Sequence, residues 1–357
     1  MTTTQSSFDQ AKLEAFMGRF VADLGTAMHV PTVLVGDRLG LYRAMADGQP
    51  VTSTELAERT GTDERYVVEW LAAQAAAEYV EYDAGAGAFR LPPEHAALLL
   101  DEGGPVFIPA GFQLAASAFK DEPMITEAFR TGEGVPWHVH HPDLFAGGER
   151  FFRAGYAANL TATWLPALED VEDKLRAGAK VADVGCGHGA STLLMAEAYP
   201  ESTFVGFDYH DASIEAARRS AETAGLGHRA SFELASAQDY PGTGYDLVTF
   251  FNSWHDMGDP VGAARHVLST LAPDGTWMMV EPYANDRIED NLNPVGKLFY
   301  AVSTLVCTPG AKAQKVGLSL GAQAGERRTR ELVTEAGFTR FRRAAENPVN
   351  LVYEARP

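Results

Sequence analysis

The chain has 357 residues, more than one ordinary domain, so about two domains are expected. Hydrophobic residues make up 46% of it, enough for a sizeable core, whereas the formal net charge of -19 opposes binding to nucleic acid or to an anionic membrane. The two cysteines lie far apart and outside any CxxC spacing, which favours a reducing cytoplasm over a disulfide framework. We see no signal peptide and no apolar run of the roughly 18 residues of a membrane span, so we expect a soluble cytoplasmic protein.

The first hundred residues predict short helices followed by a hairpin. Apolar residues recur at helical spacing in 36–48 and 62–79, and between these ranges Thr52 and Glu55 form the capping box of a further helix. Two strand-like runs around a glycine-rich turn follow at 79–91. Helix-turn-helix followed by a hairpin is the order of a winged helix.

We expect residues 1–105 to use this winged helix for packing and for a homodimer rather than for DNA. DNA binding needs a basic second helix, but this one begins Asp63-Glu64-Arg65 and also carries Glu69. The same region holds 7 Lys+Arg against 16 Asp+Glu, a net charge of -9. Such a surface repels phosphate, which supplies most of non-specific DNA affinity.

Residues 106–165 are rich in aromatic side chains and predict a helical connector that also forms a lid over a ligand pocket. The run WHVHH in this connector holds Trp137, His138, His140 and His141. In a strand, His138 and His140 would face one side at a spacing that suits metal ligands, and His255 with Asp256 could complete a site. The alternative is that these are polar connector residues that line the pocket.

Strands and helices alternate over residues 166–357, which predicts an α/β domain with a parallel sheet covered on both faces. A short apolar strand runs into Gly185-x-Gly187-x-Gly189 and then into a helix. Glycines allow the backbone to approach a ligand closely, and a helix N-terminus favours negative charge. Because Ala190 follows the third glycine, the loop also fits the dinucleotide pattern, so the glycines alone do not identify the cofactor.

Three further features favour a different adenosyl cofactor. Asp183 lies two residues before the first glycine, where a carboxylate suits a cationic amine and is awkward beside a pyrophosphate. Asp208 ends the next strand, where a carboxylate can accept two hydrogen bonds from a ribose diol. The last residues form two strand-like runs around an Asn-Pro turn, which would add an antiparallel strand to the sheet.

The segments DVGCGHG, VGFDYH, LASAQDYP and YDLVTFFNSWHD resemble the motifs of class I S-adenosylmethionine-dependent methyltransferases over about residues 166–357. The resemblance implies a Rossmann-like sheet with a terminal antiparallel strand, and S-adenosylmethionine (SAM) as cofactor. Carried over by position, it assigns the cofactor site to Asp183, Gly185, Gly187 and Gly189 around the methionine, Asp208 at the ribose, Tyr209, Ser236 and Ala237 at the adenine, and Asn252 near the methionine. Many members have Asp where this chain has Ser236, which puts the adenine contact in doubt.

The whole chain also resembles a bacterial group that joins a winged helix to this domain. Small-molecule O-methyltransferases share this architecture, and in them the N-terminal domains pair into a dimer.

His255 is the candidate general base. It follows the strand end at Phe251, on the side where ligands bind in open parallel sheets. WHDMGD resembles the HDWxD stretch of small-molecule O-methyltransferases, whose His is the base, and Glu281 at the next strand end is a candidate orienting carboxylate. With an ordinary pKa near 6.5, this His would lose its proton near neutral pH. The alternative is a His that only satisfies the hydrogen bonds of a turn.

We therefore expect methyl transfer from SAM to a small molecule, at a phenolic or enolic oxygen. Tyr300, Ser303 and Cys307 share a helical face and are further pocket candidates, although this spacing also suits core packing. Two alternatives stay open. One is a SAM-responsive DNA-binding regulator, and the other is a metal-assisted C-methyltransferase with ligands from the WHVHH run; we assign no metal.

Overall fold

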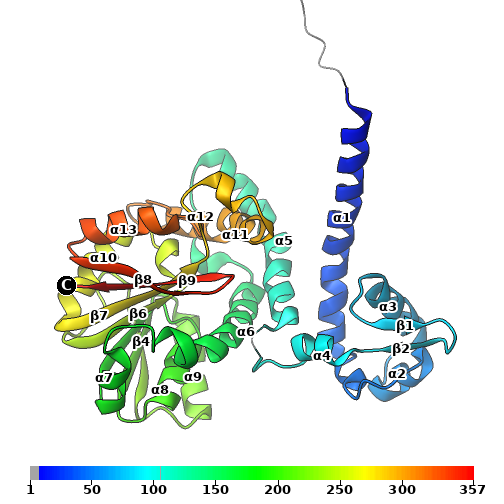
Figure 1. Ribbon diagram of the computed structural model, residues 1–357, viewed down its shortest axis with the longest axis horizontal. Coiled ribbons are helices and arrows are strands. Elements are labelled where there is room, and N and C mark those ends of the chain that lie inside the picture. The colour runs from blue at the N-terminus through cyan, green and yellow to red at the C-terminus, as the bar shows by residue number, and fades with distance from the viewer. Residues whose placement is uncertain (1–7, 105) are drawn as a thin grey trace, which may run out of the picture. The chain divides into compact units, whose positions relative to one another are not determined.

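The computed structural model describes residues 8–104 and 106–357 (Figure 1). The chain divides into two compact units: the first comprises residues up to Asp101 with Phe107–Ala116, and the second comprises Glu102–Val106 with Ser117–Pro357. None of the helices in the described part has both the length and the apolar character that crossing a membrane requires.

The first unit begins with a long helix, where the sequence predicted only short ones. Asp9 caps α1 (Gln10–Leu39) by accepting a hydrogen bond from the backbone N–H of Lys12. The predicted helix at 36–48 is wrong in its bounds. Gly40, with φ 69°, ends α1 inside this range, and only a 3-10 turn at Arg43–Met45 follows.

A winged helix makes up the rest of the first unit, as predicted. Its elements are α2 (Ser53–Thr60), α3 (Glu64–Ala76), β1 (Glu81–Asp83), β2 (Ala88–Arg90) and α4 (Pro93–Leu99). The predicted capping box of Thr52 and Glu55 opens α2, and β1 pairs antiparallel with β2. The last turns of α1 belong to the same core, because Gly36 lies so close to Tyr42 and Trp70 that a Cβ atom would be 2.6 Å from each ring.

The second unit is built on a seven-stranded sheet in the order β5-β4-β3-β6-β7-β9-β8. The strands are β3 (Lys180–Val184), β4 (Thr203–Asp208), β5 (Ala230–Leu234), β6 (Tyr245–Phe251), β7 (Leu271–Pro282), β8 (Arg340–Glu346) and β9 (Asn350–Arg356). Strands β3 to β7 are parallel, and β9 runs antiparallel to both β7 and β8. The predicted Rossmann-like sheet with an antiparallel terminal strand is confirmed, and that strand inserts between β7 and the edge strand β8.

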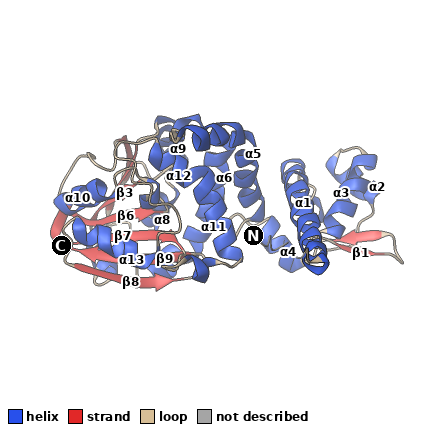
Figure 2. Ribbon diagram, turned by 90° about the horizontal axis from the view of Figure 1, so that it is seen from above, coloured by secondary structure: helices blue, strands red, loops and turns tan. Residues whose placement is uncertain are grey.

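Helices cover both faces of this sheet (Figure 2). The helices α7 (Val171–Ala177), α8 (Ala190–Ala198) and α9 (Asp211–Thr223) share one core with it, and α10 (Pro260–Thr270) and α13 (Gly325–Glu335) share the other. Side chains alternate between the cores along each strand, so Val181 packs on one side and Ala182 on the other. Both faces are therefore buried, as a parallel sheet requires.

Further helices occur in the chain between α4 and α7 and between β7 and α13. They are α5 (Ile108–Thr131), α6 (Pro142–Asn159) with a π turn at Leu160–Trp164, α11 (Pro294–Val302) with a π turn at Ser303–Cys307, and α12 (Thr308–Lys312). The segment between α5 and α6 packs on α12, because Val135 donates to the carbonyl of Pro309 at 3.0 Å. Residues Trp137–Val139 form a 3-10 turn, so the strand considered for WHVHH is wrong.

Candidate active site

The glycine loop and the segment after β6 meet at the carboxyl ends of adjacent strands. β3 pairs with β4 on one side and with β6 on the other, so the strand order reverses here. Open α/β sheets bind ligands at such a topological switch point. Ser253 donates to the carbonyl of Val184 at 3.2 Å. A Cβ atom on Gly185 would lie 2.7 Å from the Ser253 side chain, so this glycine lets the two segments touch.

The three loop glycines all have positive φ, but their surroundings differ. Gly189, with φ 83°, packs against Phe232, where a Cβ atom would lie 2.7 Å from the ring. A Cβ atom on Gly187, with φ 53°, would meet nothing within 4 Å. Gly187 therefore presents bare backbone to open space, which is what close approach of a ligand needs.

Asp208, at the end of β4, is hydrogen-bonded to this loop. Its carboxylate accepts from the backbone N–H of Gly187 and of His210, both at 2.9 Å, one bond to each oxygen. Burial raises the pKa of Asp208, and these two hydrogen bonds counter the rise. A carboxylate can accept about four hydrogen bonds, so Asp208 retains capacity for a diol. Tyr209 beside it is half-exposed.

Asp183 is completely buried, which the sequence did not indicate. It accepts hydrogen bonds from Ser191 and Thr192, both at 2.6 Å, and from Thr249 at 3.0 Å. Burial raises the pKa of Asp183, and these three hydroxyls counter the rise. The carboxylate thus ties β3 to β6 and to the first turn of α8. Its predicted contact with a cofactor amine stays a prediction.

The turn after β5 holds the predicted adenine residues. Ser236 donates through its hydroxyl to Asp239 at 2.7 Å and accepts from the N–H of Gln238 at 3.3 Å. This hydroxyl is therefore occupied within the turn. Ala237 is partly buried against the core of α10 and α13. A contact of either residue with an adenine stays a prediction.

Asn252 connects the strand end to a residue that sequence reasoning missed. It has φ 49°, a left-handed conformation that Asn tolerates better than most residues. Its side chain donates to the hydroxyl of Tyr156 at 3.2 Å and accepts from Asn350 at 3.3 Å. Tyr156 lies on α6 and is buried, and the sequence showed it only as one of many aromatic residues of the connector.

The phenol of Tyr156 lies in the field of two buried carboxylates. Burial raises its pKa, the hydrogen bond from Asn252 lowers it, and the charges of Asp183 and Glu281 raise it further. Tyr156 is thus hydrogen-bonded to Asn252 and lies in the electrostatic field of residues from both β3 and β7.

His255 lies in a 3-10 turn at Trp254–Asp256 and is buried, with 4% of its surface exposed. Its Nδ1 is 2.5 Å from a carboxylate oxygen of Glu281, which ends β7. Its Nε2 lies 3.2 Å from Oδ1 of Asp256. The structure therefore brings together the predicted base and the predicted orienting carboxylate, and adds a second carboxylate on the other ring nitrogen.

The ordinary pKa expected for His255 is wrong. Burial alone lowers this pKa, but the charges of Asp256 and Glu281 outweigh burial and hold it well above the usual 6.5. Cys307, from the π turn after α11, also contacts the ring, and burial raises the pKa of its thiol to about 12.

One group of described residues could hold a metal ion. Donor atoms of His255, Asp256 and Cys307 lie within 4.8 Å of one another. This set differs from the one considered from sequence, because it contains Cys307 and neither His138 nor His140. A metal would compete with a proton for the imidazole, so the two uses of this nitrogen exclude each other.

The three histidines of WHVHH have separate surroundings. His138 is exposed. His140 is buried, and its Nδ1 lies 2.9 Å from Asp121, which also accepts from the N–H of His141. His141 caps α6 by accepting from the N–H of Asp143 at 3.1 Å. These contacts explain the run as a helix start, and they do not show the pocket role predicted for it.

Trp137 and the other pocket candidates are placed as follows. The Trp137 ring meets Phe145 edge-on at 5.6 Å, and Phe145 stacks on His210 at 4.7 Å, next to the Asp208 turn. Ser303 is buried and accepts from the N–H of Ala322. Tyr300 is partly exposed. Cys307, which ends the π turn Ser303–Cys307, contacts His255.

Two family models match separate parts of this chain. Residues 175–336 match a model described as a methyltransferase domain. Residues 27–100 match a model described as an Rv2258c-like winged helix-turn-helix domain.

Curated relatives match only part of the chain. Sterol 24-C-methyltransferase erg6 of Aspergillus fumigatus is 28% identical over 46% of this chain and 43% of its own length. The 27-O-demethylrifamycin SV methyltransferase of Amycolatopsis mediterranei is 28% identical over 42% of this chain and 60% of its own length. The chain thus spans about half the length of these relatives.

Solved structures match the fold over almost the whole chain. Mitomycin 7-O-methyltransferase MmcR is 20% identical with a TM-score of 0.69, covering 98% of this chain and 100% of that one. Human N-acetylserotonin methyltransferase in complex with SAM is 17% identical with a TM-score of 0.71, covering 98% and 99%.

Proposed function

Because the chain is a class I SAM-dependent methyltransferase with an N-terminal winged-helix domain, we propose that it methylates an oxygen of a small-molecule acceptor. The observation that carries the proposal is the buried pair of His255 and Glu281 beside the glycine loop. Two of the similar structures are named as O-methyltransferases, and one of them is a complex with a small aromatic molecule, 2-hydroxy-5-methyl naphthoic acid. These names support the same acceptor class.

The chain's own residues fit SAM in the crevice. Gly187 gives the methionine part access to bare backbone, and Asp208 has acceptor capacity left for the ribose hydroxyls. Tyr156 and Asn252 form a polar pair near the methionine end. SAM, when bound, supplies a methyl group on a sulfonium that is ready for in-line displacement.

His255 would take the proton of the acceptor hydroxyl at Nε2, while Glu281 holds the opposite N–H and stabilises the charge. The acceptor proton would pass to His255, which would leave the oxygen to take the methyl group that SAM supplies, with S-adenosylhomocysteine as the leaving group. The products are the methylated acceptor, S-adenosylhomocysteine and a proton on His255. Since Oδ1 of Asp256 lies 3.2 Å from Nε2, the acceptor must displace it.

The test is methyl transfer from methyl-labelled SAM to a panel of phenols and enols, with and without the His255→Ala change. Labelled methyl ethers from the wild type support the proposal. Transfer only to carbon, nitrogen or sulfur acceptors contradicts it.

A second candidate is metal-assisted transfer, favoured by the grouping of His255, Asp256 and Cys307. In this case a metal rather than His255 would lower the pKa of the acceptor hydroxyl. Metal analysis of the purified protein and assay after chelation separate the two. Activity that survives complete removal of metal supports the base.

We also infer that α1 pairs with a second copy of the chain. Over its first five turns α1 exposes large apolar side chains at helical spacing: Leu13, Phe16, Met17, Phe20, Val21, Leu24 and Met28. Monomers rarely expose so long an apolar stripe, and helices commonly bury such stripes against each other. The acidic α3 argues against DNA as the partner. A Phe16→Glu, Phe20→Glu double variant should be monomeric in light scattering, whereas a monomeric wild type would contradict the inference.

A further inference from the structure

A second site lies at the opposite end of the sheet from the crevice. A cavity of about 660 Å³ is lined by Glu169, Arg330, Thr334, Gly337, Phe338, Thr339, Arg340, Phe341, Arg342, Glu354 and Arg356. Ala355 pairs with Trp277 in β7, whereas Asn350 pairs with Pro282 at the carboxyl end of β7. The lining end of β9 therefore lies toward the amino end of β7, away from the glycine loop.

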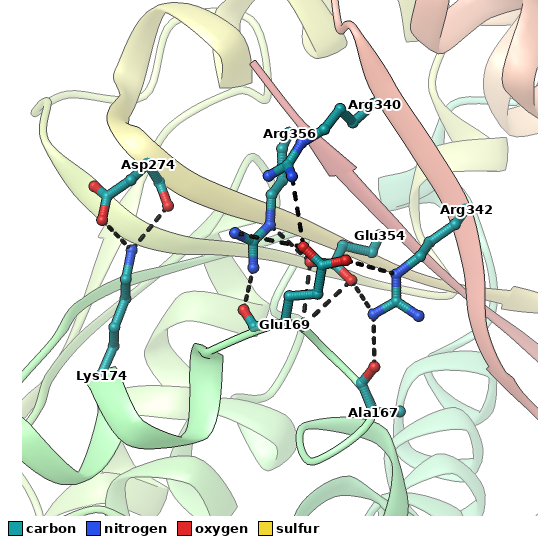
Figure 3. A network of polar contacts seen from close by, with 8 residues as sticks. All are labelled: Ala167, Glu169, Lys174, Asp274, Arg340, Arg342, Glu354 and Arg356. Atoms are coloured by element: carbon teal, nitrogen blue, oxygen red, sulfur yellow. Dashed lines mark hydrogen bonds and ion pairs between the residues drawn. The ribbon is translucent and has the colours of Figure 1, made fainter.

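Three guanidinium groups converge on the carboxylate of Glu169 (Figure 3). The nitrogen–oxygen distances are 3.5 Å from Arg340, 3.9 Å from Arg342 and 4.0 Å from Arg356. All three exceed the roughly 2.7–2.9 Å of a charge-assisted hydrogen bond. The Glu169 side chain is 52% exposed. The Glu169 carboxylate is thus half-exposed and makes only long ion pairs with the three arginines.

Glu354 is held very differently. It is 3% exposed, accepts from Arg356 at 2.8 Å and from the backbone N–H of Glu169 at 3.3 Å, and is also hydrogen-bonded by Arg342. Carbonyl groups of Ala167 and Glu169 bind the same two guanidinium groups. These contacts fix Arg342 and Arg356 in position before any ligand arrives, so little side-chain entropy remains to be lost on binding.

The residues that line this cavity carry a net positive charge, whereas the chain as a whole is negatively charged. Its lining contains four arginines and two glutamates, a net charge of +2 within a chain of net -19. The buried Nε of Arg342 has no hydrogen-bond partner. The contact that ties Arg340 to this network is its long pair with Glu169. Donor capacity is therefore left where the three arginines converge.

We propose that this cavity binds a phosphate-bearing small molecule, whose oxygens replace the carboxylate of Glu169 between Arg340, Arg342 and Arg356. Arginine is suited to phosphate because its planar fork offers parallel donors at fixed geometry. A phosphate carries more charge than the single carboxylate that it displaces, so the exchange favours the ligand. Phe341 and Phe338 line the same cavity and provide apolar surface for the body of a phosphomonoester.

A simpler use of the same residues is an ion-pair network that fastens the turn before α7 to the hairpin of β8 and β9. The two readings differ in the part played by Glu169. In the network it is a partner, and its loss only destabilises the protein. In a phosphate site it is an internal competitor, and its loss tightens binding.

The experiment is calorimetric titration of the full chain with inorganic phosphate and with phenyl phosphate at constant ionic strength. Arg340→Gln should weaken binding about fivefold or more, and Glu169→Gln should tighten it, because the competing charge is gone. Arg327→Gln, an exposed position on α13 that does not line the cavity, is the matched control and should leave binding unchanged.

Tighter binding of phenyl phosphate than of inorganic phosphate assigns the site to a phosphomonoester, and equal binding assigns it to free phosphate. The proposal is overturned if neither compound binds the wild type or Glu169→Gln at millimolar concentration. It is also overturned if Arg340→Gln and Arg327→Gln lower the affinity equally.

Discussion

The proposed cofactor side and the proposed acceptor side of the site are built in different ways. On the cofactor side, the glycine loop and Asp208 are joined by backbone hydrogen bonds over 21 residues of chain. On the acceptor side, His255 depends on Glu281 and Cys307, which come from β7 and from the turn after α11. The first side is a local motif and the second a tertiary assembly. Changes on the cofactor side should therefore alter SAM binding, and changes on the acceptor side should alter turnover.

The largest effect is expected on the acceptor side. His255→Ala should lower kcat by roughly 10²–10⁴, the usual scale for a lost general base, while SAM affinity stays within about twofold. Turnover and SAM titration of the same preparation measure both. If turnover exceeds half of the wild-type value on a good acceptor, His255 is only a turn residue.

The matching change on the cofactor side is Asp208→Ala. It removes a charged acceptor whose hydrogen bonds contribute about 1.5–3 kcal/mol each, so SAM affinity should fall at least about tenfold. At saturating SAM, kcat should change much less. Glu215→Ala, an exposed carboxylate on α9, is the control in the same titration. Equal SAM affinity in both variants would remove Asp208 from the cofactor site.

Glu281 should control the pH range over which His255 becomes a neutral base and kcat rises. Because Asp256 and Glu281 raise the pKa of His255, the neutral base forms only as pH rises through a value well above 6.5. We expect kcat to rise with pH in that alkaline range. Glu281→Gln removes one of the two charges, so the rise should move to lower pH while the plateau falls.

The raised pKa of His255 also makes the stability of the folded state depend on pH, but stability falls where kcat rises. The ion-paired imidazolium stabilises the folded state below pH 6.5, and this contribution is lost as pH rises through the raised pKa. A kcat profile centred at pH 6.5, with no displacement in the Glu281 variant, would show that these carboxylates do not control the base.

The smallest expected effect belongs to Tyr156, which lies between the two sides. Tyr156→Phe removes one hydrogen bond to Asn252, worth about 0.5–1.5 kcal/mol, and keeps the packing of the ring. We expect a change of a few fold in kcat/KM for SAM. Phe152→Leu, which alters the packing of α6 without touching Asn252, is the control. The same loss in both variants would mean that Tyr156 acts only by packing.

This contrast also explains what could be predicted from the sequence. The glycine loop, Asp208 and the sheet topology depend on local spacing and strand order, and the winged helix depends on caps and turns, so these could be predicted. The raised pKa of His255 and the link from Tyr156 to Asn252 arise from elements distant in sequence. WHVHH misled because histidines at alternate positions suggest a strand, while here the run forms a 3-10 turn and the N-cap of α6. The length of α1 was missed; only its last turns pack into the core of its own unit, while its first turns expose their apolar side chains.

The most direct test of the central claim is the rate of methyl transfer to phenols of graded acidity, by the wild type and by His255→Ala, at saturating SAM. If His255 takes the acceptor proton, the deficit of the variant should be largest for the least acidic phenol. It should shrink steadily as the phenol ionises more readily, because the base then has less to do. A deficit that is the same for every phenol, or no deficit at all, would contradict the account.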